Sequence, residues 1–182
     1  MSPKRNFRQD LCAAIMCLIT LGLPLSSLAQ TSCVPPSLHS KLNEQYPGWH
    51  IVGILDLRVD DQNIWKARHA GDCPGVTRGK FDSNAKEATA VILFKKRLDG
   101  SYIQTLVVAD EQDGHYKFSV LSASQDVAYL SVVSIWPPGT YSNVNDEKFK
   151  LKLDSIEYEA IEAGSLLYFY KDGAFHSELV DQ

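Results

Sequence analysis

The sequence lacks the patterns by which many catalytic sites are recognised. It has no G-x-S-x-G nucleophile motif and no glycine-rich loop of the kind that holds phosphate. Its five histidines are scattered, and no two have the four-residue spacing of a metal-binding pair on a helix. We therefore predict no cofactor and no resident metal.

Positive charge is also scarce. Lys and Arg number 18 against 22 Asp and Glu, which gives a formal net charge of −4. Nucleic acid is bound by large clusters of Lys and Arg, and the sequence contains none. We therefore predict that nucleic acid is not a partner, whereas an acidic surface suits a basic protein.

Long apolar runs are missing after residue 29. Before that point, three basic residues precede the apolar run Leu11–Leu25, and Ser27-Leu28-Ala29 has the form of a cleavage site. The run is shorter than the ~20 residues that span a bilayer. We predict a signal peptide over 1–29, a single β-rich domain over 30–182, a secreted or periplasmic location, and no membrane contact after cleavage.

Cysteine is rare, since the chain has four and two of them lie in the predicted signal peptide. Cys33 and Cys73 remain, and in an exported chain they most simply form one disulfide. The bond would close a loop of about 40 residues and stabilise the fold by a few kcal/mol. Neither cysteine lies in a C-x-x-C motif, so a redox role is not expected.

Apolar spacing predicts one helix followed by strands. Leu38, Leu42 and Tyr46 are four residues apart, which indicates a helix over 38–46, and 49–57 reads as the first strand. We interpret the polar segment 58–72 as a long surface loop.

Three Asp-Gly pairs lie between strand-like runs, at 99–100, 113–114 and 172–173. Asp-Gly favours the tight turns of β-hairpins. Together these signals predict an α+β fold, in which an N-terminal helix packs on one twisted, mainly antiparallel sheet of about seven to nine strands.

Two charged faces alternate with apolar residues near the end of this predicted sheet. Lys148, Lys150 and Lys152 form one face, while Glu157 and Glu159 form the other. We expect these charges to pair across neighbouring strands. As an alternative, two of the three carboxylates at 157, 159 and 162 would serve as the acid and base of a glycoside hydrolase.

The segment 79–90 has the spacing of a calcium loop. Asp82 and Asn84 occupy the first and third positions, Glu87 follows, and an apolar strand begins at residue 90. Two ligands with backbone carbonyls fall short of the six to eight oxygens that calcium takes. We predict that the loop keeps its turn without a bound ion, with weak binding through Asp82, Asn84 and Glu87 as the alternative.

This loop resembles the loop of FG-GAP and VCBS repeats, the integrin-α-type motif. Small secreted bacterial proteins of unknown role carry one copy in a similar layout, which Tyr46–Trp49, Cys73–Gly75 and Leu167–Phe175 match. Ser83 and Ala85 stand where that motif has glycine, and Ala88 stands where it has Asp. Because there is a single copy, a multi-bladed propeller is not expected.

A segment rich in aromatic residues and proline follows the strand 129–136. Trp136, Pro137, Pro138 and Tyr141 together could form an exposed apolar tip, and such tips are candidate contact surfaces. The alternative is that Trp136 packs beneath the sheet.

We predict an exported, non-enzymatic binding protein with a protein partner, for example an inhibitor or immunity-type protein against a hydrolase. The alternatives are a small carboxylate-dependent hydrolase of cell-wall or sugar substrates and a calcium-stabilised FG-GAP-like module.

Overall fold

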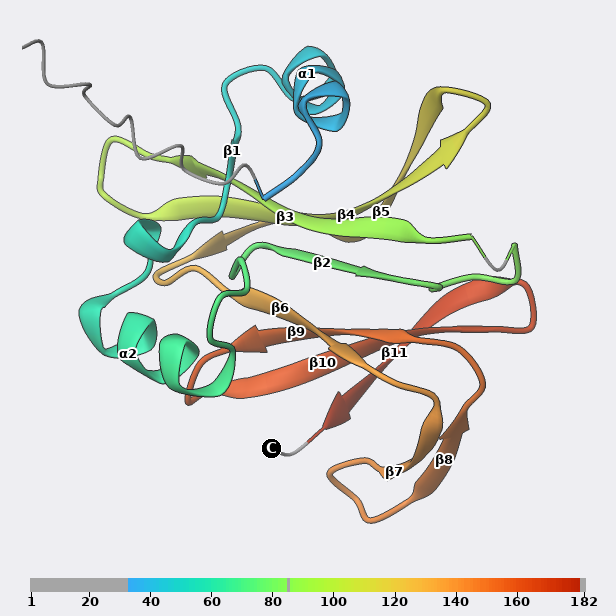
Figure 1. Cartoon of the computed structure of the whole chain (residues 1–182). Coiled ribbons are helices and arrows are strands. Elements are labelled where there is room, and N and C mark those ends of the chain that lie inside the picture. Colours follow the sequence, from blue (N-terminus) through green and yellow to red (C-terminus); the bar gives the residue numbers. More distant parts are fainter. Residues whose placement is uncertain (1–32, 85, 181–182) are drawn as a thin grey trace, which may run out of the picture. The chain divides into compact units, whose positions relative to one another are not determined.

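A computed structural model describes residues 33–84 and 86–180, so the predicted signal peptide lies outside the described residues. The described chain forms eleven strands and two short α-helices (Figure 1). The helices are α1 (Pro36–Gln45) and α2 (Val59–Arg68). The strands are β1 (His50–Ile51), β2 (Val76–Gly79), β3 (Ala88–Lys96), β4 (Tyr102–Gln112), β5 (His115–Val127), β6 (Val132–Trp136), β7 (Gly139–Ser142), β8 (Lys148–Leu151), β9 (Ser155–Ala160), β10 (Gly164–Lys171) and β11 (Ala174–Val180).

The first sheet is built around β3, the most apolar strand. Its order is β1-β3-β4-β5, and β2 also pairs with β3. Alternate side chains of β3 enter different clusters: Ile92 lies in the main core, while Val91 and Leu93 lie in a second cluster with Leu38 and Leu42 of α1. Because both faces of β3 are covered, nearly every position from 88 to 94 is apolar and buried.

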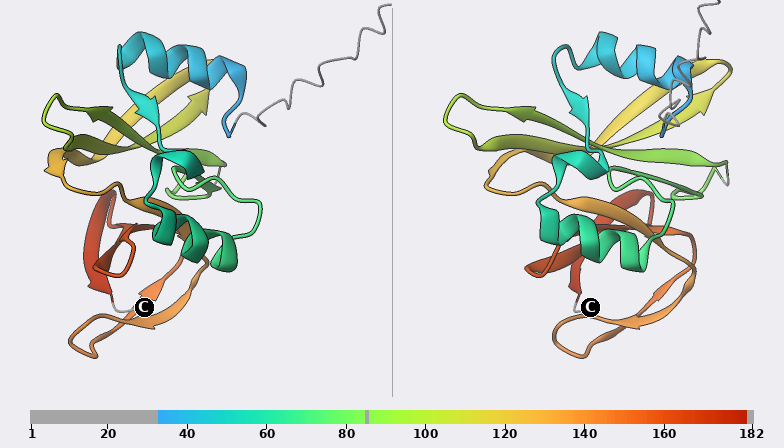
Figure 2. Two further views of the ribbon diagram at one scale, coloured as in Figure 1. Left: turned by 90° about the vertical axis from the view of Figure 1, so that its left-hand side faces the viewer. Right: turned by 60° about the vertical axis from the view of Figure 1, so that its left-hand side comes forward.

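The second sheet has the order β11-β10-β9-β6, and β7 and β8 form a separate two-stranded sheet. Figure 2 shows the first sheet, green and yellow, and the second sheet, orange and red, as two layers. The main core fills the space between them, with Ile92 and Leu106 from the first sheet and Ile156 and Tyr158 from the second. The architecture is a β-sandwich whose two inner faces share one core.

The predicted fold class is therefore wrong. The structure is 50% strand and 16% helical, with several antiparallel sheets and two short helices, in place of one sheet under an N-terminal helix. Period-two alternation predicted strands correctly, but it carries no information about which strands share a sheet. The segment 128–131 connects the first sheet to the second. Its amino-acid composition gives no sign that the chain changes sheets there.

The predicted loop at 58–72 contains helix α2, which is a further correction. Asp61 and Trp65 are the buried residues of this helix. Acidic residues lie in its first turn and basic residues in its last turn, an order that suits the helix dipole. The segment looked irregular in sequence because it has too few apolar residues to show a stripe.

The three Asp-Gly hairpins are confirmed, since the turns join β3 to β4, β4 to β5, and β10 to β11. Asp113 and Asp172, like the glycines that follow them, have positive φ, as the tight hairpin turn requires.

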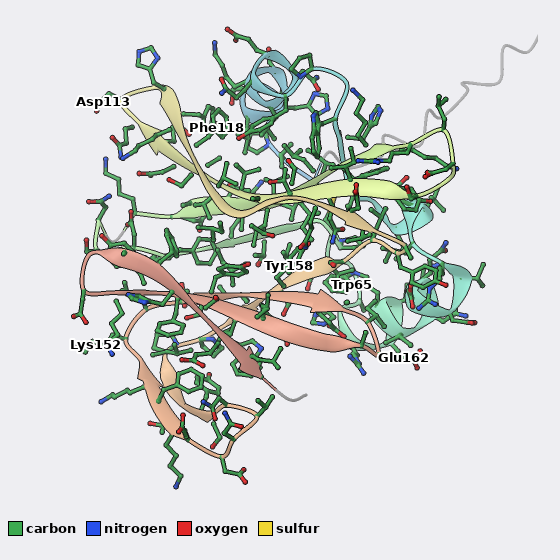
Figure 3. All side chains as sticks on the ribbon, turned by 180° about the vertical axis from the view of Figure 1, so that it is seen from behind. Trp65, Asp113, Phe118, Lys152, Tyr158 and Glu162 are labelled. Carbon is green, nitrogen blue, oxygen red and sulfur yellow. A yellow bond between two sulfur atoms is a disulfide. The ribbon has the colours of Figure 1, made fainter. Side chains whose placement is uncertain are left out.

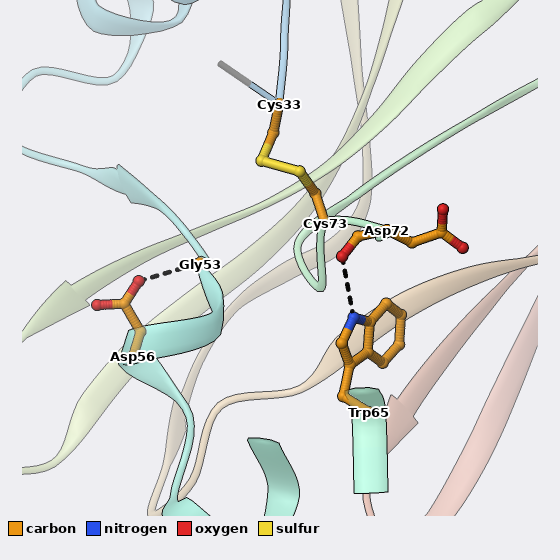
Figure 4. Close-up of a disulfide and its surroundings, with 6 residues drawn as sticks. All are labelled: Cys33, Gly53, Asp56, Trp65, Asp72 and Cys73. Atoms are coloured by element: carbon orange, nitrogen blue, oxygen red, sulfur yellow. Dashed lines mark hydrogen bonds between the residues drawn. A yellow bond between two sulfur atoms is a disulfide. The ribbon is translucent and has the colours of Figure 1, made fainter. Parts of the chain in front are cut away.

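The disulfide between Cys33 and Cys73 is confirmed, with Cα atoms 5.9 Å apart (Figure 4). Next to it, Trp65 Nε1 donates a hydrogen bond of 3.1 Å to the carbonyl oxygen of Asp72, which ties α2 to the segment before Cys73. Gly75 follows, and a Cβ there would lie 2.7 Å from the Cβ of Val52, so the close approach requires glycine. No helix in residues 33–84 and 86–180 is long and apolar enough to cross a membrane.

Candidate functional site

A cleft of about 380 Å³ opens between the two sheets, where the ends of β4 and β5 meet the β9–β10 turn and β11. Its walls are mostly apolar, and its polar residues come from four separate parts of the chain. The lining residues are Gln104, Gln125, Val127, Ala128, Tyr129, Ser131, Tyr158, Ala160, Ala163, Gly164, Ser165, Leu166 and Leu179.

Four of the polar lining residues, Gln104, Gln125, Ser131 and Tyr158, form a connected hydrogen-bond cluster. Gln104 Oε1 accepts a bond of 3.0 Å from the backbone N–H of Ser131, and Gln104 Nε2 donates to Ser131 Oγ at 2.9 Å. The same Nε2 donates to the hydroxyl of Tyr158, to which Gln125 Nε2 also donates at 3.1 Å. Gln104 is 1% exposed, so its bonds form away from water, where they are strong and where losing one is costly.

The geometry of β4 explains why a glutamine can point into the core. Gln104 lies two positions before Leu106 and four before Val108, and both of these residues belong to the main core, so the alternation of β4 places Gln104 on the same inward face. Tyr158 reaches the same point from β9, and Figure 3 shows it between the two sheets. Burial raises the pKa of Tyr158 above its usual value of 10, because the ionised phenolate would be poorly solvated.

Tyr129 stands at the mouth of the cleft and is 58% exposed. The Arg58 guanidinium lies 4.1 Å from the centre of its ring, which is a cation–π contact. Arg58 is itself held by two hydrogen bonds, of 2.7 and 2.8 Å, to the buried Asp61 of α2. Hydrogen bonding to Asp61 also raises the pKa of Arg58, so the cation is permanent. Asp61 and Arg58 thus orient the aromatic ring beside the opening.

The cleft combines apolar walls with a small group of hydrogen-bonded polar side chains. Apolar walls remove hydrocarbon surface from water, and the buried hydroxyls of Tyr158 and Ser131 lie in the hydrogen-bond cluster at the inner end of the cleft. The cluster includes no nucleophile paired with a base and no carboxylate.

The aromatic residues of the predicted contact loop lie against one another. The rings of Trp136 and Tyr141 are 4.7 Å apart and are half-buried in a small cluster with Phe149. The Tyr141 hydroxyl donates to the carbonyl oxygen of Pro137 at 2.8 Å, and Pro137 and Pro138 are exposed. Of the four residues predicted to form the apolar tip, the two prolines are therefore the exposed ones.

In the predicted calcium loop, two of the three candidate ligands bond to each other. Asp82 Oδ1 accepts from the backbone N–H of Asn84 at 2.9 Å, and Asp82 Oδ2 accepts from its side-chain amide at 2.9 Å. Glu87 is exposed. Over 33–84 and 86–180, no group of three or more His, Cys, Asp or Glu residues is placed to hold a metal ion.

The carboxylates proposed as a catalytic pair are bonded to other groups of the protein. Glu157 and Glu159 are both buried, at 6% and 3% exposure. Ser134 Oγ donates to Glu157 at 2.6 Å, and Arg68 of α2 forms an ion pair of 3.1 Å with Glu159. Glu162 lies apart on the β9–β10 turn, where it is exposed (Figure 3).

Sequence reasoning missed the cleft. One signal was available, because Gln104 and Thr105 interrupt an apolar strand and a buried glutamine must find partners. Its partners are 27 and 54 residues away, beyond the reach of any local pattern.

No protein-family model, curated protein or solved structure matches this chain.

Proposed function

We propose that this chain is a non-enzymatic binding protein that holds a small, largely apolar ligand in the cleft between β4–β5 and β9–β11. The observation that carries the proposal is an apolar cleft with a satisfied hydrogen-bond cluster at its inner end. A volume of about 380 Å³ matches a ligand with one or two rings, since small-molecule pockets begin at about 300 Å³.

The physical chemistry sets the expected affinity. A ligand that buries about 300 Å² of apolar surface gains about 7.5 kcal/mol at 25 cal/mol per Å². Lost translational and rotational freedom offsets a large part of this gain. One hydrogen bond to Tyr158 or Ser131 adds about 1 kcal/mol. Dissociation constants in the micromolar to millimolar range follow for a simple ligand.

The test uses N-phenyl-1-naphthylamine, an uncharged probe whose fluorescence rises in apolar surroundings. Ala160 shares a strand face with Tyr158, because the two residues are two positions apart in β9, and it lines the cleft. Ala160→Phe fills the cleft and should weaken probe binding about tenfold. Ala123→Phe, on an exposed part of β5 outside the cleft lining, is the matched control and should bind as the parent does. Equal binding by all three proteins would refute the proposal.

The proposed location is the periplasm or the extracellular space. The Cys33–Cys73 disulfide supports it, because such bonds persist in oxidising compartments. Fractionation of cells that express the full chain tests the location. Recovery of residues 30–182 with the disulfide intact from the periplasm or medium is expected, and a full-length cytoplasmic product would contradict it.

A protein partner is the second candidate, and exposed apolar side chains favour it. Leu55 and Val59 flank Arg58 in sequence and are 77% and 70% exposed, while Tyr129 contacts Arg58. Clustered apolar side chains on a surface are typical of interaction sites. A partner that co-purifies with the parent should be lost with Leu55→Asp/Val59→Asp and kept with Leu98→Asp, a fully exposed control. Loss with both variants, or with neither, would contradict this surface.

A further inference from the structure

A second pocket, of about 460 Å³, lies at the opposite end of β9 from the cleft. It lies between the segment that follows β8 and the β10–β11 turn. Figure 3 shows how far the pocket lies from the cleft: Lys152 lies at this end of the second sheet, and Glu162 lies at the other end. The lining residues are Ser83, Lys150, Leu151, Lys152, Leu153, Ser155, Phe169, Tyr170, Lys171, Asp172 and Gly173.

Lys150, Lys152 and Lys171 line this pocket, and none of them has an acidic partner among the described residues of the neighbouring sheet. The sequence predicts that Lys148, Lys150 and Lys152 pair with Glu157 and Glu159, and this prediction is wrong. The strand that carries Lys150 pairs with β7, while β9 pairs with β6 and β10. Glu159 is bonded to Arg68 instead. None of the four ion pairs found in the described part of the chain involves Lys150, Lys152 or Lys171.

The local charge is therefore opposite to that of the whole protein. Asp172 is the one acidic residue in the lining, which leaves an excess of two positive charges. The chain as a whole carries −4, and the region after residue 29 is more acidic still. Like charges repel when they converge, so three lysines around one pocket favour an anion that neutralises them.

The floor of the same pocket is apolar. Leu151, which is 3% exposed, and the half-buried Phe169 belong to one apolar cluster, whereas the half-buried Tyr170 lies on the opposite face of β10. The Phe169 ring stacks on Phe149 at 5.8 Å and on His176 at 5.9 Å, so its position is held by neighbours on both sides. A rigid apolar floor beneath a cationic rim selects a molecule that has both an apolar body and a negative group.

We propose that this pocket binds a small organic anion, with its carboxylate, sulfonate or phosphate group between Lys150, Lys152 and Lys171 and its apolar body against Phe169. The volume of the pocket suits one small molecule, which sets this site apart from a flat basic track for a polymer. The proposal goes beyond the cleft and does not depend on it, because the two sites share no lining residue.

The test is calorimetric titration of the oxidised protein with 2-naphthalenesulfonate. Lys150→Gln/Lys171→Gln removes two rim cations and should weaken binding about tenfold, since each partly exposed ion pair contributes up to about fivefold. Lys66→Gln/Lys117→Gln removes two exposed lysines elsewhere and changes the net charge equally, so it should bind within twofold of the parent. All four lysines are exposed, and the variants should keep the parent's circular dichroism.

Two further ligands separate charge from apolar contact. Inorganic sulfate should bind at least tenfold more weakly than the sulfonate, because it lacks the apolar body. Uncharged 2-naphthalenemethanol should also bind at least tenfold more weakly, because it lacks the anion. Sulfonate binding should be unchanged in Ala160→Phe, which alters only the cleft.

Other outcomes would overturn the proposal. Absence of sulfonate binding, or equal weakening in both double variants, would show that the lysines form no specific site. Equal affinity for inorganic sulfate and for the sulfonate would show that the site recognises negative charge and not the apolar body. Loss of sulfonate binding in Ala160→Phe would place the ligand in the cleft.

Discussion

Replacement of Gln104 by leucine should destabilise the protein far more than its similar size suggests. The side chain is 1% exposed and takes part in three hydrogen bonds, two of them with Ser131. In Gln104→Leu, the backbone N–H of Ser131 loses its acceptor while Ser131 remains 3% exposed. A buried donor without a partner costs about 1–3 kcal/mol, and the donors to Ser131 Oγ and Tyr158 are also lost. We expect a loss of about 3 kcal/mol in the free energy of unfolding.

Tyr158→Phe gives the comparison that tests this reasoning. Removal of the hydroxyl leaves both bonds between Gln104 and Ser131 in place. Gln125 is exposed, so its amide can turn to water. The buried Gln104 amide also loses an acceptor but keeps Ser131 Oγ, so the expected loss is about 1 kcal/mol, the low end of the cost of a buried donor that loses a partner. Gln104→Leu should therefore lower the free energy of unfolding about three times as much as Tyr158→Phe does.

The assay is equilibrium unfolding in urea, followed by tryptophan fluorescence on oxidised protein. Gln112→Leu is the control, because Gln112 lies on the same strand and is exposed, and it should change the free energy by less than about 0.5 kcal/mol. If Gln104→Leu lowered the free energy of unfolding no more than Tyr158→Phe does, the bonds between Gln104 and Ser131 would not be the ones that stabilise the cluster. If it cost no more than the control, the buried bonds would contribute nothing to stability.

Three other predictions follow from single contacts. Reduction of Cys33–Cys73 should lower the free energy of unfolding by about 4 kcal/mol, measured by urea titration with and without reductant, and an unchanged midpoint would contradict it. Arg68→Ala should lower the free energy of unfolding by about 2 kcal/mol in the same assay, because it leaves the Glu159 side chain, which is 4% exposed, without its ion-pair partner. The double variant Arg68→Ala/Glu159→Gln should recover part of this stability, and no recovery would argue against the ion pair. The raised pKa of Tyr158 means that the folded state holds this proton more tightly than the unfolded state. Its contribution is complete below pH 10 and declines as pH rises further, so Tyr158→Phe should show a smaller alkaline loss of stability; identical profiles would refute this.

Features that depend on neighbouring residues were determined by the sequence. Asp-Gly pairs set three hairpins because the glycine of each pair, and in two of the three also the aspartate, adopts positive φ as a local property. A strand with both faces buried reads as the apolar run 88–94. The pairing of Cys33 with Cys73 was also determined once the other two cysteines were assigned to the signal peptide. Each of these inferences uses chemistry that acts within a few residues, or a count that leaves one solution.

The tertiary structure alone decided where the chain changes sheets and what the charged residues face. Lys150 and Glu157 look like partners in the sequence, yet their strands lie in different sheets. Gln104 meets Tyr158 across 54 residues, and the lysine pocket gathers side chains from three separate segments. The alternation of apolar and polar residues shows which side chains share one face of a strand. These sites depend instead on which faces of different strands pack against each other. That outcome is set by the packing of the whole core, which no local pattern contains.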